Sequence, residues 1–395
     1  MHGPLERDFD RFGREWRADV VDHIRQTYRI DLTTSYLGRT LPHPIGKGSG
    51  QLSLRADQLE ADAAAGLAFV VLKTVIAQDE RGGQSMAAWA VHETRMKVER
   101  IRSLTGREGW TVTWKGRGWD RSLDEYLALV RAGRDLTRAG GPLVVPSVKY
   151  HLPAAGEPFR DEEYRFTTGQ LAQTWGKEAL LLEKDFSPTL AGDALADERS
   201  QVLRWVREVP GRIRSGAPHG LVLGLKLMNA RFDDAFQREM IDAARGSGAD
   251  ALVVFNRLFD PVKRVAFGGW DLSDRNLRVL ARTGPQGGRG RSLPLSGTGN
   301  VHSGRLILDY ARAGCATVQL HTYFQVPLGE YPARHGSRTA RVLHKLLFDP
   351  EDGLVAGMLD LEARGGLARV GGELRFRDLI DGALPGGTIA AARST

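Results

Sequence analysis

Lysines and glycine turns stand at the ends of several apolar runs in this 395-residue chain. Lys73 and Thr74 end the run "AFVVLKT", and Lys226 lies inside the run "GLVLGLKL". Glycine-rich turns end two other runs, "GKGSG" at residues 46–50 and "SGTGN" at 296–300. A buried ammonium is costly unless it meets an anion or takes part in chemistry, and main-chain N–H groups in glycine turns bind anions. The pattern predicts a site for an anionic molecule.

The turns after the last two apolar runs have the composition of a phosphate-binding site. Ser296, Gly297 and Gly299 stand in the first turn, ahead of a helix expected to begin near Ser303, and His321 with Thr322 ends the second run. Glycines let main-chain N–H groups point at an anion, and the N-terminus of a helix adds its dipole. The alternative is that these glycines only permit tight turns. The two turns together favour phosphate binding.

Lys226 allows three interpretations. It is an ion-paired or snorkelling structural lysine, a Schiff-base lysine of the aldolase type, or a cation that neutralises a reduced, anionic cofactor ring. The residues alone do not rank the last two.

Eight apolar runs of strand length alternate with segments of helical periodicity. Such alternation requires a parallel sheet with both faces covered, and eight units in about 300 residues predict a closed (β/α)₈ TIM barrel, with an open doubly wound sheet as the alternative. In a barrel the carboxyl ends of the strands line the active site. The runs are residues 43–50, 68–74, 142–148, 178–185, 220–227, 249–256, 292–297 and 316–322.

Other segments surround this alternation. Residues 1–30 are expected to form a helical clasp, and a hairpin turning at Gly38 follows it. The barrel is expected over residues 31–350 with a long loop insertion at 76–121, and residues 351–395 are expected to form a tail packed on the barrel.

The insertion carries Trp110, Trp114 and Trp119 beside basic residues. It is interpreted as a pair of strands that caps the barrel mouth, or as a substrate lid whose aromatic rings stack on a flat ligand.

Composition excludes several classes of site. With one cysteine, Cys315, the chain has no internal disulfide and no Cys-ligated cluster or zinc, and no His/Asp/Glu spacing resembles a metal site. The excess of 55 Lys+Arg over 48 Asp+Glu, +7, is spread among acidic residues. This mixture favours a solvated surface, then an anionic small molecule, then nucleic acid. Without a signal peptide or membrane-span pattern, a cytoplasmic protein is expected.

Three stretches resemble the FMN-binding barrels of the dihydroorotate dehydrogenase group. They are "DLTTSYLGRTLPHPIGKGSG", "LKLMNARFDDAFQREMIDAARGSGADALVVFNRLFD" and "LSGTGNVHSGRLILDYARAGCATVQLHTYF", and the similarity runs from about residue 31 to 325. The segment "GADALVVFNRLFDP" is most similar to the bacterial dihydroorotate dehydrogenase-like proteins.

The resemblance implies an FMN cofactor and gives roles to matching residues. Lys226 matches the family lysine that faces the flavin N1 and O2 edge, where an ammonium stabilises the charge of the reduced ring. Other matching positions line the ring, the substrate or the phosphate: Gly48, Ser49, Lys73, Thr74, Asn256, Gly297, Gly299 and Thr322.

The resemblance also places a general base on the loop after the fourth strand. There a Ser or Cys before Pro removes a proton from carbon while hydride leaves the neighbouring carbon for flavin N5. Ser187-Pro188 stands at this position, with Lys184 and Asp185 as candidates to assist a serine that is otherwise a poor base. The alternative is that Ser187 only begins a turn before proline.

Departures from the family concern the substrate. Lys184 and Thr189 stand where the family has asparagines that bind the pyrimidine, and "FNRLFD" replaces further polar groups after strand six. Losing such hydrogen bonds argues against orotate. The expected substrate is another conjugated or carbonyl-bearing small molecule, with Arg257 or Lys184 available to an anionic group.

The leading hypothesis is therefore an FMN oxidoreductase that acts on a CH–CH bond. A phosphate-binding aldolase or isomerase with a Schiff base on Lys226 is the main alternative. An RNA-directed enzyme similar to dihydrouridine synthases is less favoured, because Cys315 lies away from the strand-four loop. A barrel that binds FMN without turnover is a further alternative. The electron partner is expected to be soluble, and the oligomeric state is open, with a homodimer among the alternatives.

Overall fold

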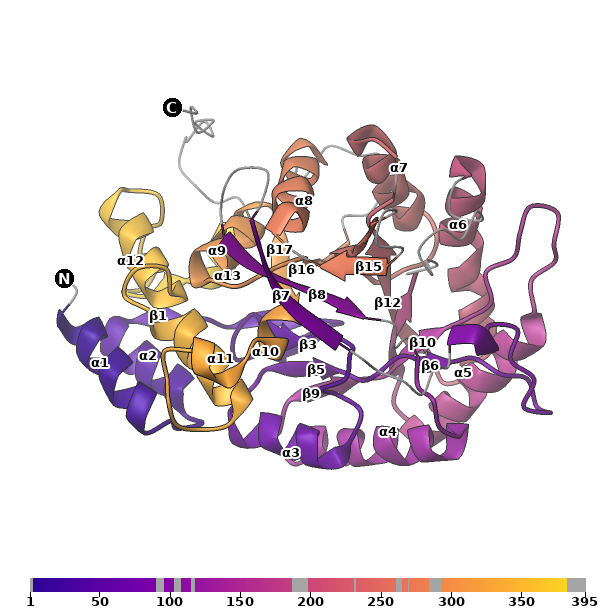
Figure 1. The fold of residues 1–395 in the computed structure, drawn as a ribbon, viewed down its shortest axis with the longest axis horizontal. Coiled ribbons are helices and arrows are strands. Elements are labelled where there is room, and N and C mark those ends of the chain that lie inside the picture. Colours follow the sequence, from indigo (N-terminus) through magenta and orange to yellow (C-terminus); the bar gives the residue numbers. More distant parts are fainter. Residues whose placement is uncertain are drawn as a thin grey trace.

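A curled parallel sheet wrapped in helices forms the centre of the molecule (Figure 1). The structure is a computed structural model that describes residues 3–89, 96–102, 108–114, 118–186, 198–230, 232–260, 265–268, 270–283 and 293–381. Its strands follow the predicted apolar runs: β4 (Ile45–Lys47), β5 (Phe69–Val71), β6 (Val75–Ile76), β9 (Leu143–Val145), β10 (Ser147–Lys149), β11 (Leu180–Asp185), β12 (Leu221–Met228), β13 (Ala251–Asn256), β16 (Leu295–Thr298) and β17 (Cys315–Leu320).

The strand order shows that this sheet returns to its starting point. The hydrogen-bonded order is β6-β10-β11-β12-β13-β16-β17-β4-β5-β9. β5 and β6 belong to one chain segment and β9 and β10 to another, and β5 pairs with β9 while β6 pairs with β10. The pairings therefore run around eight chain segments, each parallel to its neighbours.

The ladder between the second and third segments is interrupted, so hydrogen bonding is not continuous around the sheet. Pro146 separates β9 from β10 and has no N–H to donate. Between β5 and β6 the main-chain N–H of Lys73 donates to the carbonyl of Ser53 instead of to a strand, at 2.9 Å. The predicted α/β protein with a TIM-barrel-like parallel sheet is confirmed, whereas an unbroken closed ladder is not observed.

Helices cover the outer face of this sheet, as the alternating sequence pattern predicts. Several begin at a side-chain cap: Ser122 caps α4, Asp233 caps α7, and Ser303 accepts from the N–H of Leu306 to cap α9 at the expected position. The helices along this part of the chain are α3 (Ala56–Ala64), α4 (Leu123–Arg138), α5 (Asp161–Trp175), α6 (Arg199–Ser215), α7 (Asp234–Arg245), α8 (Trp270–Thr283), α9 (Gly304–Arg312), α10 (Thr322–Gln325) and α11 (Arg338–Phe348).

The N-terminal segment, expected to be a helical clasp, forms two helices. α1 (Gly3–Arg14) and α2 (Val20–Tyr28) are separated by a bend. The Asp8 carboxylate accepts hydrogen bonds from Tyr28 Oη at 2.7 Å and lies 2.6 Å from His23 Nε2, contacts that a single straight helix could not make. α1 packs against α11 (Figure 1).

The predicted hairpin at Gly38 is present and closes the amino end of the barrel. β2 (Thr34–Tyr36) and β3 (Arg39–Leu41) are antiparallel, and Gly38 has φ +74° at the turn. The ring of Tyr36 stacks on Phe69 at a centroid distance of 4.7 Å. The hairpin therefore places a phenol inside the barrel, beneath the middle of the sheet.

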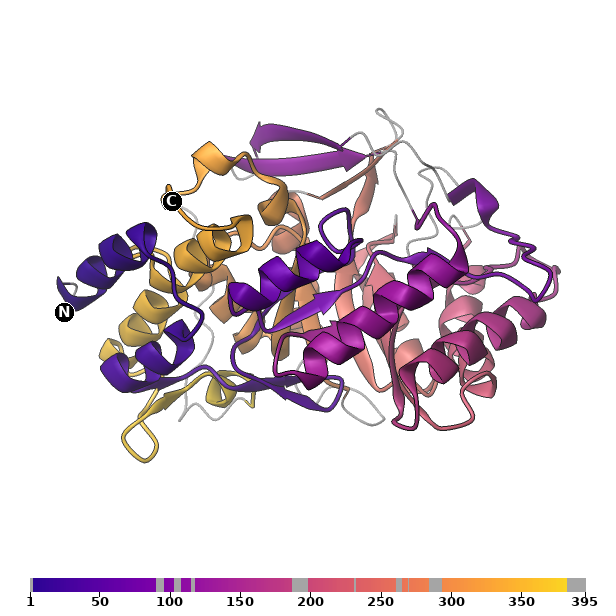
Figure 2. The same cartoon turned by 90° about the horizontal axis from the view of Figure 1, so that it is seen from below.

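The described part of the insertion after the second strand contains two strands. β7 (Met96–Arg102) and β8 (Glu108–Trp114) are antiparallel, as the strand-pair interpretation predicts, and they lie outside the barrel strands (Figure 2). β15 (Val265–Gly268) pairs with β8, and β14 (Leu258–Asp260) with β15. These two strands were not predicted. Both are short, and the partner of β15 in β8 lies about 150 residues away, so they leave little local signal.

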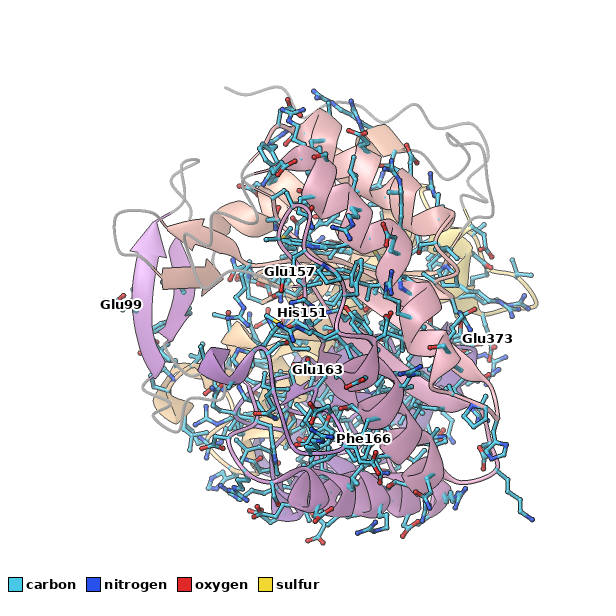
Figure 3. The ribbon with its side chains drawn as sticks, turned by 90° about the vertical axis from the view of Figure 1, so that its right-hand side faces the viewer. Glu99, His151, Glu157, Glu163, Phe166 and Glu373 are labelled. Atoms are coloured by element: carbon cyan, nitrogen blue, oxygen red, sulfur yellow. The ribbon has the colours of Figure 1, made fainter. Side chains whose placement is uncertain are left out.

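Contacts to the barrel fix the start of the insertion. The Glu163 carboxylate at the start of α5 accepts hydrogen bonds from the Ser85 N–H at 2.7 Å and the Ser85 hydroxyl at 2.8 Å. Figure 3 labels Glu163 beside His151 and Glu157, which belong to the loop after β10. Further along, Arg100 of β7 forms a 2.6 Å ion pair with Glu330.

The C-terminal part adds α12 (Leu354–Ala363), β18 (Leu374–Arg375) and α13 (Phe376–Ile380). β18 pairs in parallel with β1 (Ile30–Asp31), and α12 and α13 contact α9. In the part of the chain that is described, no helix combines the length and apolar character needed to cross a membrane.

Candidate functional site

Cationic side chains converge at the carboxyl end of the barrel. Lys73, Lys149 and Lys226 are each no more than 5% exposed. Lys73 lies close enough to Arg257 and Lys149 for their charges to lower its pKa. The charges of Arg257, Lys73 and Lys226 in turn lower the pKa of His321. A cluster of buried like charges is unfavourable unless it faces an anion. Glu183 pairs with Lys226, and the charges of Asp185 and Asp120 act on Lys73, so the mouth is a densely charged region that holds both basic and acidic side chains.

Lys73 and Arg257 both have a pKa below the usual value. Burial, assisted by the neighbouring Arg257 charge, lowers the pKa of Lys73 to about 7, although Asp185 and Asp120 oppose the shift. Burial lowers the pKa of Arg257 to about 10, so its guanidinium stays charged near neutral pH. Lys73 can therefore exchange a proton near neutrality, while Arg257 supplies a permanent charge.

Lys226 stands above a buried polar network. Its Nζ lies 3.3 Å from Gln319 Oε1 and 3.6 Å from Glu183 Oε1. The other oxygen of Glu183 accepts from Tyr36 Oη at 2.8 Å and from Gln319 Nε2 at 2.6 Å. Of the three interpretations of Lys226, the ion pair with Glu183 is observed directly, and it is compatible with a cofactor on the side that faces the mouth.

Hydroxyls join the turn after β4 to the second and third strands. Ser49 Oγ lies 2.8 Å from Thr74 Oγ1, which lies 3.0 Å from Ser147 Oγ. The N–H of Gly48 donates to the carbonyl of Leu320 at 2.8 Å. The structure thus brings together the ends of strands one, two, three and eight, as the positions of Gly48, Ser49 and Thr74 predict.

His321 closes the other side of this turn. A Cβ on Gly50 would lie 2.0 Å from His321 Nε2, so the imidazole rests directly on the glycine. Burial, together with the neighbouring cations, lowers the pKa of His321 well below its usual value. The ring is therefore neutral at physiological pH.

A small cavity lies where phosphate binding is predicted. Its volume is about 40 Å³, and its walls include Asn256, Arg257, Gly299, His321 and Thr322. Gly299 has φ +113°, a conformation that favours glycine. Asn300 also lines the cavity, and its buried Nδ2 has no acceptor among the described residues. A donor left unsatisfied in this position fits a ligand oxygen.

Two of the predicted cradle residues have packing contacts instead. A Cβ on Gly297 would lie 2.4 Å from the ring of Tyr310, so this glycine admits α9 to the sheet. Ser296 is 1% exposed, and its hydroxyl accepts from Thr317 at 2.9 Å, deeper in the barrel. Their predicted contact with a cofactor remains a prediction.

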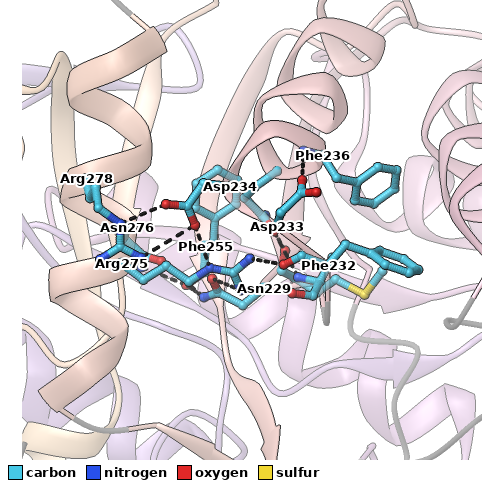
Figure 4. A network of polar contacts seen from close by, with 12 residues as sticks. Asn229, Phe232, Asp233, Asp234, Phe236, Phe255, Arg275, Asn276 and Arg278 are labelled. Atoms are coloured by element: carbon cyan, nitrogen blue, oxygen red, sulfur yellow. Dashed lines mark hydrogen bonds and ion pairs between the residues drawn. The ribbon is translucent and has the colours of Figure 1, made fainter. Parts of the chain in front are cut away.

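A network outside the sheet holds the cradle in place (Figure 4). The Asn276 amide on α8 donates to the carbonyl of Thr298 at 2.6 Å and accepts from Asn229 Nδ2 at 3.1 Å. Arg275 donates to the carbonyls of Ala230 at 2.8 Å and Phe232 at 2.7 Å. The ends of β12, β13 and β16 are thereby tied to one helix.

Lys184 does not face the mouth, so its prediction as a catalytic or substrate-binding residue is wrong. Glu183 and Asp185 point into the barrel, and the alternation of a strand turns Lys184 to the outer face. There it is fully buried, with Nζ 4.9 Å from the centroid of Phe186 and donating to the carbonyl of Asp185 at 2.9 Å. Burial holds its pKa well below the usual value.

The predicted general base and its neighbour on the loop after the fourth strand are not described by the structure. Ser187 and Thr189 lie outside the described residues. Within the described residues, no group of His, Cys, Asp or Glu side chains could hold a metal ion.

Sequence reasoning missed Lys149, Glu183, Gln319 and Tyr36. Lys149 had a visible signal, because its apolar run continues through Ser147 and Val148 and ends in a lysine, as the second run does. Glu183, Gln319 and Tyr36 come from segments about 150 residues apart, and no spacing rule joins them.

Comparison with known proteins supports the fold. No protein-family model and no curated protein matches the chain. Among solved structures, the chain is similar to the crystal structure of DHODH in complex with ferulenol from Eimeria tenella, with a TM-score of 0.57 and 13% sequence identity over 93% of this chain and 94% of that one. At this identity the likeness establishes a DHODH-like fold and leaves substrate and mechanism to other arguments.

Proposed function

We propose that this protein is an FMN-dependent oxidoreductase that acts on a CH–CH bond of a small conjugated or carbonyl-bearing molecule. The observation that carries the proposal is the set of cations at the mouth, the buried Lys73, Lys149 and Lys226 with the partly buried Arg257, next to the cavity at Gly299 and Thr322. A flavin nucleotide carries a phosphate and gains negative charge on its ring when reduced, so it matches both parts.

The residues of this chain would bind and orient the cofactor. Lys226 would face the ring edge where negative charge develops, and the Asn300 amide with the turn at Gly299 would bind the phosphate. Ser49 and Thr74, already hydrogen-bonded to each other, would border the ring. FMN, when bound, accepts a hydride at N5.

Lys73 is the described residue best suited to move the proton. With a pKa of about 7, a large share of its amine is neutral near physiological pH and able to accept a proton from a substrate carbon. Asp185, which raises the pKa of Lys73 electrostatically, would stabilise the ammonium that forms. Ser187 remains the other candidate base.

The charge of the mouth favours an anionic substrate. Arg257 keeps its charge near neutral pH, and its guanidinium would attract a carboxylate or similar group of the substrate. Thr189, and Lys184 on the outer face of its strand, stand where the family has asparagines that bind the pyrimidine, so the amides that would pair with the ring of orotate are missing. We therefore propose a substrate other than orotate.

A Schiff-base aldolase or isomerase is the second candidate, and one observation favours it. Lys73 has the lowered pKa that such a nucleophile needs, whereas the amine of Lys226 forms an ion pair with the Glu183 carboxylate at 3.6 Å. The alternative on Lys226 is therefore less favoured than a Schiff base on Lys73.

The visible absorption spectrum of the purified protein, with mass spectrometry of the released chromophore, tests the proposal. Flavin bands and the mass of FMN are expected. A colourless protein that does not bind added FMN would contradict it, and borohydride trapping of a carbonyl compound on Lys73 would support the second candidate.

The proposal leaves the partners to experiment. We propose a soluble electron partner and no nucleic-acid ligand, and a homodimer is one of the assemblies that ultracentrifugation would distinguish.

A further inference from the structure

Glu183 is a fully buried acid that the proposed chemistry does not use. It lies on the inward face of β11, two residues before Asp185. Asp185 pairs in register with Lys226, and Glu183 pairs with Gly224. Glu183 is therefore one layer deeper than Lys226, on the side away from the mouth.

The contacts of Glu183 are unequal on its two oxygens. Oε2 accepts from Tyr36 Oη at 2.8 Å and from Gln319 Nε2 at 2.6 Å. Oε1 is buried and accepts no hydrogen bond among the described residues, and its nearest cation is Lys226 Nζ at 3.6 Å. One oxygen is thus fixed by neutral donors, and the other directs its charge at Lys226.

Lys226 makes long polar contacts with the residues beneath it. Its contacts at 3.3 Å to Gln319 and 3.6 Å to Glu183 are longer than the 2.7–2.9 Å typical of a charge-assisted hydrogen bond. The ammonium therefore keeps hydrogen-bonding capacity for a partner on the mouth side. Its charge is shared between that partner and the carboxylate beneath it.

We propose that Glu183 is a positioning residue that lowers the reduction potential of the bound flavin by partly neutralising Lys226. This inference rests on the proposed function, because it concerns the same cofactor site. A negative charge behind Lys226 reduces the stabilisation that the lysine gives to the reduced, anionic ring, and leaves the neutral oxidised ring almost unaffected.

The amide of Gln319 and the phenol of Tyr36 hold the Glu183 carboxylate in its position beside Lys226. Gln319 Nε2 also donates to Tyr36 Oη at 3.0 Å, so its Oε1 is turned toward Lys226. Burial and the adjacent Glu183 carboxylate raise the pKa of Tyr36 well above its usual value, which keeps the phenol a donor. Both groups donate to the Glu183 carboxylate and hold it in place.

The test compares the two-electron potential of the FMN-loaded full-length protein with that of its variants, by equilibration with redox dyes. In Glu183→Gln we expect reduced flavin to be favoured about tenfold more, a rise of about 30 mV for a two-electron couple. Sulfite, which adds to oxidised flavin and leaves a negative ring, should bind about tenfold more tightly. Glu163→Gln, a change at a buried acid of α5 bonded to Ser85, should leave both values at wild type.

Two further variants separate the proposed role from a structural one. Lys226→Met combined with Glu183→Gln should have the potential of Lys226→Met alone, because Glu183 acts through the lysine. Glu183→Asp keeps the negative charge but moves it farther from Lys226. The flavin potential of this variant should therefore lie between those of wild type and Glu183→Gln. This variant carries the test if Glu183→Gln does not fold.

Unchanged potential and sulfite affinity in flavin-loaded Glu183→Gln, or in Glu183→Asp if only that variant folds, would overturn the inference and leave the proposed function intact. A full shift that persists without Lys226 would also overturn it. A wild-type protein that binds no flavin would overturn the inference and the proposed function together.

Discussion

The side-chain amide of Asn276 donates a 2.6 Å hydrogen bond to the main-chain carbonyl of Thr298. Asn276 is fully buried on α8, and Thr298 is the last residue of β16, immediately before the turn at Gly299. Tyr310 Oη donates to the same carbonyl at 3.0 Å. The turn that would hold a phosphate is thus positioned from the side opposite the ligand.

Asn276→Ala should weaken both the fold and cofactor binding. The change removes one of the two donors to the Thr298 carbonyl and the acceptor of an Asn229 N–H, and we expect a loss of about 2–4 kcal/mol in the free energy of unfolding. Because the turn at Gly299 loses its support, the Kd for FMN should rise by about tenfold or more. Urea unfolding and a fluorescence titration with FMN would measure the two effects.

Arg278→Ala is the matched control on the same helix. Arg278 is half-exposed and pairs with Asp234 at the surface, so its loss should change stability by less than about 1 kcal/mol. Wild-type FMN affinity in Asn276→Ala would show that the network does not position the cradle.

Much of the fold is predictable from the sequence because it depends on local patterns. The apolar runs become the strands of the parallel sheet, and the helix after Ser303 begins where a side-chain cap was expected. The antiparallel sheet of the insertion was only half predicted. β15 reaches β8 from residues about 150 positions away, and this pairing depends on tertiary packing rather than on local propensity.

The positions of candidate site residues were predictable where each residue stands at the carboxyl end of its own strand. Lys73, Lys226 and the turn at Gly299 do face the mouth, because parallel strands share a carboxyl edge. Lys184 was misplaced because a shift of one residue along a strand turns a side chain to the other face. The sequence "EALLLEKD" does not show which of its residues face the barrel interior, because apolar and charged residues occur on both faces of this strand.

Asp62→Asn should strongly destabilise the protein through Lys47. Lys47 belongs to the turn sequence "GKGSG", but its Nζ points outward to the Asp62 carboxylate on α3 at 2.5 Å. Both side chains are buried, so the change leaves an unpaired ammonium. We expect a loss of about 3–5 kcal/mol, measured by urea unfolding.

The double variant Lys47→Met with Asp62→Asn should recover much of that stability, since an apolar side chain often replaces a buried ion pair well. Equal stabilities of wild type and Asp62→Asn would mean that the pair contributes nothing.

Gly50→Ala should disturb the site more than the fold. The new methyl group would lie 2.0 Å from His321 Nε2, so the imidazole must move away from the turn after β4. We expect the Kd for FMN to rise by about tenfold or more, with a loss of about 1–3 kcal/mol in stability from overpacking. Adding His321→Ala should remove the clash and restore the stability lost in Gly50→Ala, as measured by urea unfolding. No recovery in the double variant would place the cause of the loss elsewhere.

Lys73→Met should stabilise the protein at low pH while abolishing its activity. The pKa of Lys73 is about 7 in the folded state and 10.5 in a free side chain. Between these values the unfolded chain binds a proton that the native protein lacks, so stability rises with pH across this window. The full cost, at most about 5 kcal/mol, is present below pH 7 and disappears above pH 10.5. Methionine carries no such cost.

The gain in Lys73→Met should therefore be largest near pH 6.5 and should shrink toward pH 10, in urea unfolding without ligand. Lys345→Met is a control of opposite sign. Although burial opposes it, the hydrogen bonds to Asp349 and Asp352 raise the pKa of Lys345, so removing that lysine should destabilise the protein. A gain in Lys73→Met that does not vary with pH would mean that Lys73 keeps an ordinary pKa in the fold, and the assignment of this lysine as the proton acceptor would fall with it.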